Sequence, residues 1–405
     1  MNFKKKNYTN KIRNGITFLI PALNEQESIK YTIDLCKKFL KKNPNIICEI
    51  LVCDNNSTDK TVSIAKKNGC RVIIETNKGY GSNIINGIKK AKYNYIIFGD
   101  ADGSYDFSDS KKFYELLEKD FDLVMGNRFS NKKSYKMAKN SMPILHRFFG
   151  NPVLSFIARF LFQIDIKDFH CGLRAIKKDS FYNGKIFICN GMEFATEVVA
   201  IASKLNLKVT QVPVKLYPDK RKSSSPHLNT WSDGWRHLKF ILVMSHSKIF
   251  INFALFFLMI NCSFHIFYFF REFLQLNILT NLNLVTSLFL NALSYVGFNL
   301  IILSIFLTNT IEKNYKIDFI KKEKIENFLT KINPDTYFKF SGIILLIIFY
   351  SIYFIFDVWK LSDYRFLDLN SNKVIYHILI FSQLIPILLF LIKMGFINYT
   401  LKDQD

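Results

Sequence analysis

In the first half of the chain, short apolar runs alternate with segments of helical periodicity. Each apolar run has the length of a strand and ends in a cluster of Pro, Asn, Asp, Ser or Gly, which is typical of a turn. Strands that alternate with helices predict βαβ units and a mainly parallel sheet. The predicted strands are residues 16–20, 49–53, 71–75 and 95–98, and the predicted helices begin at Asn24 or cover 58–67 and 82–90.

Polar loops follow all four predicted strands. They cover residues 21–25, 54–57, 77–81 and 100–106. Because ligands of such sheets bind beyond the carboxyl ends of the strands, these four loops are expected to converge on one ligand.

The second half of the chain contains four long apolar stretches, at residues 249–270, 284–307, 340–356 and 374–392. About 20 apolar residues cross a hydrocarbon layer of about 30 Å, so we interpret them as membrane spans. The third and fourth are short, and re-entrant or packed helices are the alternative. Lysines crowd residues 312–339, whereas Arg271 is the only basic residue between the first two spans. The bias predicts that residues 312–339, the N-terminal domain and the C-terminal tail are cytosolic.

A segment before the spans has the pattern of an interfacial helix. Trp231, Trp235, Leu238 and Leu242 share one helical face, with cations beside it. An amphipathic helix packed on the domain is the alternative, and residues 143–162 are likewise either a membrane-surface helix or a buried one. The predicted organisation is a basic tail (1–14), an α/β domain (15–227), an interfacial helix (228–247), a transmembrane region (248–398) and a tail (399–405).

The net charge of +22 indicates an anionic partner. No helix-turn-helix, zinc-finger or aromatic RNA-binding pattern accompanies it, so we expect a membrane or phosphate partner and no nucleic acid. The seven cysteines form no Cys-x-x-Cys pair, which favours small buried side chains in a reducing compartment.

Two carboxylates, Asp100 and Asp102, end the fourth predicted strand. Placed one residue apart, both can turn toward a divalent cation, which would neutralise a diphosphate leaving group. At the second strand end, Asp54 can accept from the N–H of a nucleobase while Ser57 caps the next helix. Lys78 and Gly79 precede a helix start, where a phosphate can approach the backbone.

The order of these motifs resembles the inverting family-2 glycosyltransferases of GT-A (Rossmann-like) fold. The resemblance rests on Ile-Pro-Ala-Leu-Asn-Glu (20–25), Val-Cys-Asp-Asn-Asn-Ser-Thr-Asp (52–59), Asn-Lys-Gly-Tyr-Gly (77–81), Asp-Ala-Asp-Gly (100–103) and Gly-Asn-Arg-Phe (126–129). Asp-Phe-His-Cys-Gly-Leu-Arg (168–174) and Gly-Met-Glu-Phe-Ala-Thr-Glu (191–197) are similar to the dolichyl- and polyprenyl-phosphate sugar synthases. The similarity covers about residues 15–245.

The resemblance implies roles for particular residues. The catalytic residues would be Asp102, Asp168 and Arg174, and the metal ligands for Mg²⁺ or Mn²⁺ would be Asp100 and Asp102. With the residues singled out above, the nucleotide-sugar set is Pro21, Ala22, Glu25, Asp54, Lys78, Gly79 and Asp100. The acceptor-phosphate set is Arg128, Arg147 and Arg174, to which Lys220 and Arg221 in a basic loop are added. The branch commonly has Leu-Gln after Asp-Ala-Asp, where this chain has Gly103 and Ser104; Asp106 or a water would replace the Gln at the metal.

The implied activity is transfer of a hexose, glucose or mannose, from a UDP- or GDP-linked donor to polyprenyl or dolichyl phosphate, with inversion, at the cytosolic membrane face. A lipid monophosphate is already an anion and needs no strong general base. The first alternative is a glycolipid or polysaccharide synthase with a hydroxyl acceptor; residues 231–236 lack the Gln-x-x-Arg-Trp of processive synthases, which favours single transfer. The second is a non-catalytic membrane scaffold. Homo-oligomerisation stays open.

Overall fold

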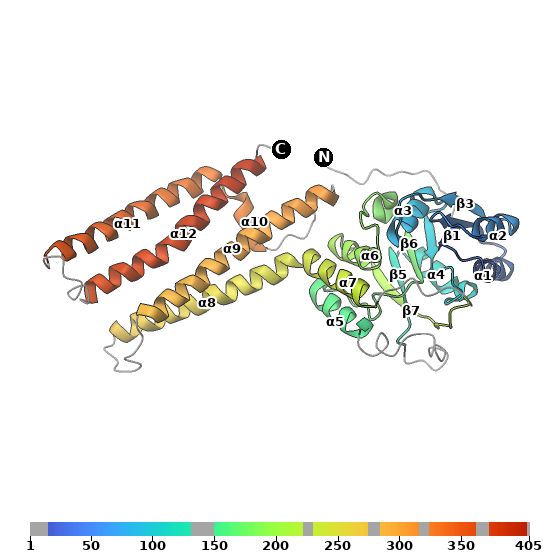
Figure 1. The fold of residues 1–405 in the computed structure, drawn as a ribbon, viewed down its shortest axis with the longest axis horizontal. Helices are drawn as coiled ribbons and strands as arrows, with labels where there is room; N and C mark the ends of the chain where they lie inside the picture. Colours follow the sequence, from blue (N-terminus) through green and yellow to red (C-terminus); the bar gives the residue numbers. More distant parts are fainter. Residues whose placement is uncertain are drawn as a thin grey trace. The chain divides into compact units, whose positions relative to one another are not determined.

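The computed structural model describes residues 15–130, 150–221, 230–273, 284–315, 324–361 and 372–402. The predicted basic tail, residues 222–229 and Arg147 lie outside these ranges. The chain divides into two compact units, one of residues 1–244 with 315–320 and one of residues 245–314 with 321–405 (Figure 1). Each unit is described by itself below.

The first unit is built on a seven-stranded sheet with the strand order β3-β2-β1-β4-β6-β5-β7. All neighbouring pairs are parallel except those of β6, which runs antiparallel to both β4 and β5. The predicted mainly parallel sheet is therefore confirmed. The strands are β1 (Gly15–Ala22), β2 (Ile47–Asp54), β3 (Arg71–Ile74), β4 (Tyr95–Phe98), β5 (Leu123–Asn127), β6 (Arg174–Lys177) and β7 (Val209–Pro213).

Helices cover the sheet and close its core. Phe18 on β1 packs edge-to-face on Phe39 and Phe107, with ring centroids 5.1 and 5.9 Å away. The helices of this unit are α1 (Ile29–Lys42), α2 (Thr61–Lys67), α3 (Tyr80–Lys90), α4 (Lys111–Glu118), α5 (Asn151–Phe162), α6 (Phe194–Lys204) and α7 (Thr230–Met244), with short 3₁₀ helices η1 (Phe107–Asp109) and η4 (Asp179–Gly184).

Two predicted helix starts were wrong. The first helix begins at Ile29 rather than Asn24, because Asn24 has a left-handed backbone with φ of 55°. The second begins at Thr61 with Lys60 as its N-cap, so Ser57 does not cap it. Ser57 instead bonds Asp54, as described below.

The antiparallel strand β6 positions the site. Arg174, its first residue, lies opposite Phe98 of β4 and Met125 of β5. Because an antiparallel strand begins where its neighbours end, residues 168–173 lie at the carboxyl ends of β4 and β5. The loop of residues 168–173 therefore lies beside the residues that follow β4 and β5.

The second unit consists of long apolar helices. Four are long and apolar enough to cross a membrane, over His246–Phe267, Phe289–Tyr315, Pro334–Lys360 and Phe381–Asn398. The third range extends beyond the predicted 340–356 at both ends, whereas the fourth begins later than the predicted 374–392 and ends later, inside a helix that covers Asn372–Lys402. The elements are α8 (His246–Phe273), α9 (Leu284–Tyr315), α10 (Lys324–Lys331), α11 (Pro334–Leu361) and α12 (Asn372–Lys402).

In the second unit, many large apolar side chains are exposed and polar side chains are buried between the helices. Large apolar groups face outward, with Leu346 70% exposed. Inside, the Asn261 amide donates to Ser294 and to Gln383, and the Asn291 amide donates to Ser382. Neutral polar groups thus join α8, α9 and α12 within the apolar helices.

Candidate active site

The loops after β1 and β2 are tied into one surface. The backbone N–H of Asn24 donates to Ser57 Oγ at 2.8 Å, and the N–H of Thr58 donates to Asn24 Oδ1 at 2.9 Å. The strands themselves align Pro21 with Cys53 and Ala22 with Asp54. Pro21, Ala22 and Asp54, predicted to hold the nucleoside, therefore lie together.

Glu25 is buried at the same edge. Its carboxylate accepts from Ser28 Oγ at 2.6 Å and lies 3.4 Å from a guanidinium nitrogen of Arg221. Burial raises the pKa of Glu25 to about 7, although Ser28 and Arg221 oppose this rise. Ser28 and Arg221 therefore fix the direction of the Glu25 carboxyl group, while its burial favours the protonated form.

Asp54, the last residue of β2, and Asn55, which follows it, make different hydrogen bonds. Asp54 accepts from both the N–H and the hydroxyl of Ser57, so its carboxylate is turned into the loop. The Asn55 side chain donates to the carbonyls of Glu75 and Asn77 and accepts from the N–H of Gly79. Sequence reasoning missed this role of Asn55. Its position directly after the strand, between two polar residues, was the available signal.

The glycines at the start of α3 are required by close backbone contacts. A Cβ on Gly79 would overlap the carbonyl oxygen of Asn190, and one on Gly81 would overlap that of Cys189. The N–H of Ser82 also donates to Asn190 O at 3.1 Å. The close approach that we expected for a phosphate is made here by the chain's own residues 189 and 190. Lys78 beside them is exposed.

Asp100 and Asp102 follow β4, as the sequence predicts. Asp100 accepts from the Tyr80 hydroxyl at 3.3 Å, and a Cβ on Gly172 would overlap its other oxygen. Burial raises the pKa of Asp100 to about 6, and the charge of Asp102 adds to the rise. Arg128 and Arg174 oppose this rise without cancelling it.

Arg221 lies on these carboxylates. Its guanidinium is 3.2 Å from Asp102 and 2.6 Å from Asp219, in addition to Glu25. The exposed neighbour Lys220 places its ammonium over the ring of Tyr31. The sequence assigned both cations to the acceptor, whereas the structure brings Arg221 to the predicted metal and donor residues. Asp219 was missed because nothing but its charge distinguishes it in the sequence.

Arg128 and Asp168 form a buried bidentate pair. Arg128 donates through Nε and Nη2 to the two Asp168 oxygens, each at 2.7 Å, and its backbone N–H adds a third bond at 3.0 Å. Burial alone would lower the pKa of Arg128, but the Asp168 charge outweighs burial and raises it. Asp168 therefore fixes the guanidinium, and both its oxygens are engaged.

Arg174 is only 2% exposed. It donates to the carbonyls of Cys171, Ala195 and Phe169, so that it holds the loop before β6 against α6. Burial lowers the pKa of this guanidinium. These contacts position the loop before β6; the catalytic and phosphate-binding roles that the resemblance implied for Arg174 stay predictions.

Comparison with known proteins identifies the family of the chain. The family model described as Glycosyl transferase family 2 matches residues 17–184. An uncharacterized protein of Methanocaldococcus jannaschii is 34% identical over 52% of this chain and 86% of its own length. The chain belongs to glycosyl transferase family 2.

Two further relatives of the family have informative names. The low-salt glycan biosynthesis hexosyltransferase Agl6 of Haloferax volcanii is 32% identical over 58% of this chain, and the match spans only 55% of that protein. A dolichyl-phosphate beta-glucosyltransferase of Drosophila melanogaster is 27% identical over 49% of this chain and 66% of its own length.

Among solved structures, a glucosyl-3-phosphoglycerate synthase from Mycobacterium tuberculosis, in complex with Mn²⁺, UDP and phosphoglyceric acid, is similar over 57% of this chain and 78% of its own. The TM-score is 0.44 and the identity 17%.

The family-2 domain offers hard oxygen donors for a divalent cation. Asp100 and Asp102 fit such an ion, because two carboxylates follow the same strand one residue apart and oxygen is the donor atom that Mg²⁺ and Mn²⁺ prefer. Within the described ranges, no group of three or more His, Cys, Asp or Glu side chains is placed to hold a metal. Asp106 accepts from the Ser108 N–H through Oδ1 and caps η1, so the alternatives of Asp106 or a water at the place of the Gln stay predictions.

Two helices of the first unit expose bulky apolar side chains. Trp235 on α7 is 57% exposed and Phe160 on α5 is 66% exposed, while the polar His237 is buried. α7 and α5 pack on each other, and Thr196 bonds His237 at 2.8 Å. Burial lowers the pKa of His237 to about 4. The solvent face of α7 thus carries Trp235 together with the exposed cations Arg236 and Lys239.

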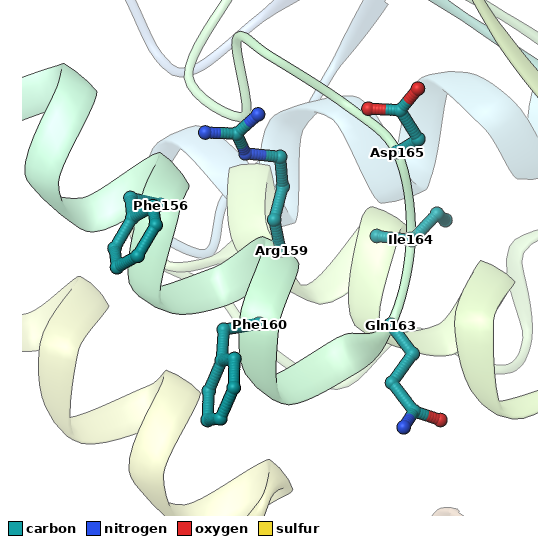
Figure 2. A pocket seen from close by; sticks show the side chains of 6 residues that line it. All are labelled: Phe156, Arg159, Phe160, Gln163, Ile164 and Asp165. Carbon is teal, nitrogen blue, oxygen red and sulfur yellow. The ribbon is translucent and has the colours of Figure 1, made fainter.

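A pocket of about 450 Å³ opens beside these side chains on α5 (Figure 2). Phe156 and Phe160 lie one turn apart, and the guanidinium of Arg159 stands 6.0 Å from the Phe156 ring. The remaining lining residues are Gln163, Ile164 and Asp165. The pocket therefore combines two apolar rings with one cation and one carboxylate.

Proposed function

We propose that this family-2 glycosyltransferase transfers a hexose, glucose or mannose, from a UDP- or GDP-linked donor to polyprenyl or dolichyl phosphate with inversion. The names of two relatives, a hexosyltransferase and a dolichyl-phosphate beta-glucosyltransferase, support the reaction class and the acceptor. The arrangement of Arg128 and Asp168 is the observation that carries the choice of acceptor.

Arg128 suits a phosphate better than a hydroxyl. Its third guanidinium nitrogen, Nη1, has no hydrogen bond within the described residues, and Asp168 fixes its direction. A guanidinium held in this way binds an anion without further ordering. A hydroxyl acceptor would require a base, whereas both oxygens of Asp168 are engaged.

The donor belongs at the loops after β1, β2 and β4. Pro21, Ala22 and Asp54 would line the nucleoside, with Lys78 at the rim, and Asp100 and Asp102 would hold Mg²⁺ or Mn²⁺. When bound, that cation would supply Lewis-acid stabilisation of the diphosphate charge. Glu25 is the neighbouring carboxylate of the same set.

The reaction is a single displacement. An oxygen of the lipid phosphate bonds to the anomeric carbon while the bond from that carbon to the diphosphate oxygen breaks. The nucleoside diphosphate leaves with the electron pair, and the sugar inverts. No proton has to move, because the attacking phosphate is an anion.

The lipid would reach this site along α5 and α7. Exposed Trp235, Phe156 and Phe160, with the Arg159 guanidinium near the Phe156 ring, match an interface of acyl chains and anionic headgroups. The four membrane-length helices would anchor the chain, and the lysines of residues 312–339 would place the domain on the cytosolic side. The position of Arg147 is outside the described residues.

A lipid-transfer assay tests this function. Membranes containing the full chain would be supplied with labelled UDP- and GDP-hexoses and a polyprenyl phosphate, and label in the lipid extract would be measured. A phosphodiester-linked sugar is released by mild acid, whereas a sugar on a hydroxyl stays bound. We expect acid-labile lipid label that requires added polyprenyl phosphate.

The inactivating variant is Asp102→Asn, which should reduce the label at least about a hundredfold, since an electrostatic contact to the leaving group is lost. Asp109→Asn, at η1, is the control substitution and should leave the label unchanged. Acid-stable label would identify the hydroxyl-acceptor alternative. Equal label from wild type and Asp102→Asn would point to a scaffold with a contaminating activity.

A further inference from the structure

The residues after β7 form a strap across the Asp-Ala-Asp turn. The N–H of Tyr217 donates to Ser104 O and the N–H of Lys220 donates to Asp102 O, both at 2.9 Å. Gly103 has φ of 77°, and a Cβ there would lie 2.7 Å from Lys220 Cγ. The strap, residues 214–221, therefore passes directly over the turn, and a glycine is needed beneath it.

The strap ends by placing a cation among three carboxylates. The Arg221 guanidinium is only 9% exposed and contacts Glu25, Asp102 and Asp219. Asp219 accepts from both the backbone N–H and Nε of Arg221, which fixes the direction of the side chain. The Asp102 oxygen that contacts Arg221 is one that a divalent cation would use.

A guanidinium and a metal ion cannot share this oxygen at low cost. Both are positive, and their repulsion is strong where water is excluded. A metal that enters alone must therefore displace Arg221 from Asp102 and leave a buried charge with fewer partners. A nucleoside diphosphate entering with the metal brings the negative charge that restores the balance.

We propose that Arg221 is a built-in counter-cation that occupies the metal-binding carboxylate and keeps metal affinity low until the nucleotide binds. The inference rests on the metal site of the proposed function, but not on the sugar or the acceptor. It predicts that metal and nucleotide bind cooperatively. It also makes Arg221 a residue that determines the order of binding.

Mn²⁺ binding to the full chain in detergent tests this inference, with free Mn²⁺ measured by electron paramagnetic resonance. Without nucleotide, Arg221→Gln should bind Mn²⁺ about tenfold to a hundredfold more tightly than wild type, because a charged contact no longer competes. Addition of UDP or GDP should tighten wild-type binding much more than that of the variant. Arg221→Lys, which retains the charge, should stay near wild type.

The matched control is Lys215→Gln on the same strap, where the ammonium lies over the Tyr217 ring instead of a carboxylate. It should leave Mn²⁺ affinity unchanged, and adding Asp102→Asn to Arg221→Gln should abolish the gain. Equal or weaker Mn²⁺ binding by Arg221→Gln, or no binding by either protein, would overturn the inference. A tightened affinity without lipid transfer would retain it and refute the acceptor proposal alone.

Discussion

The two units of the chain differ in the polar groups that join their elements. In the first, the buried groups at the strand ends are charged and paired, as in Arg128 with Asp168. In the second, the contacts between α8, α9 and α12 include the neutral amides and hydroxyls of Asn261, Ser294 and Gln383, and the buried carboxylate of Glu326 accepts from Ser304. Large apolar side chains such as Leu346 face outward in this second unit.

The difference teaches where each unit can carry chemistry. A charge at a strand end is balanced by a neighbour and remains close to water, so it can bind an ionic ligand. A charge inside apolar helices is far more costly, whereas an amide pair holds helices together at modest gain. Substitutions should therefore have unequal effects in the two units.

Breaking the buried ion pair should have the largest effect. Asp168→Ala leaves the Arg128 charge buried without its partner and should lower the free energy of unfolding by about 3–5 kcal/mol. Denaturant unfolding of the full chain, followed by tryptophan fluorescence, measures this. The double variant Arg128→Met with Asp168→Leu should recover most of the loss. A cost below about 1 kcal/mol for Asp168→Ala would show that Asp168 is not the main partner that stabilises the Arg128 charge.

His237 should contribute a loss of stability in acid. Burial lowers its pKa from 6.5 to about 4. Between these values the unfolded chain binds a proton at this group that the folded chain does not, so the contribution of His237 to stability falls by about 3 kcal/mol at pH 4, whereas the raised pKa values of Glu25 and Asp100 act in the opposite direction. The free energy of unfolding of wild type should therefore fall relative to that of His237→Gln as the pH is lowered across this window. An unchanged pH slope in that variant would assign acid sensitivity to another group.

Removing one amide from the second unit should cost less. Asn261→Leu loses the contacts to Ser294 and Gln383 and should destabilise the helices by about 0.6–1.7 kcal/mol, the range for hydrogen bonds between membrane helices. Heating in detergent, with resistance to proteolysis as the readout, measures the loss. Met259→Leu, at an exposed position of α8, is the control. A loss as large as that of Asp168→Ala would contradict the difference between the units.

The exposed face of α7 should give the smallest change in stability. Trp235→Ser should alter the free energy of unfolding by no more than about 0.5 kcal/mol, because the side chain contacts solvent rather than the core. It should nevertheless raise the KM for polyprenyl phosphate and leave the KM for the nucleotide sugar unchanged. A loss of stability near 2 kcal/mol would show instead that Trp235 packs against protein.

Much of the fold followed from local pattern. The apolar runs and turn clusters located β1 to β4, and long apolar stretches located the helices of the second unit. Asp100 and Asp102 were found because they directly follow a strand. The start of α2 was mispredicted, since the polar cluster at residues 54–59 offered several caps and only the bond from Ser57 to Asp54 selected among them.

By itself, the sequence determined the order of strands and helices, the change from a mixed to a strongly apolar composition between the two halves, and the carboxylate pair, because each depends on neighbours in the chain. Tertiary structure alone decided which charges meet. The antiparallel entry of β6 buries Arg174 among carbonyls and brings Asp168 to Arg128, and the strap brings Arg221 to Asp102. Such pairings join residues far apart in sequence, where no local periodicity records the partner.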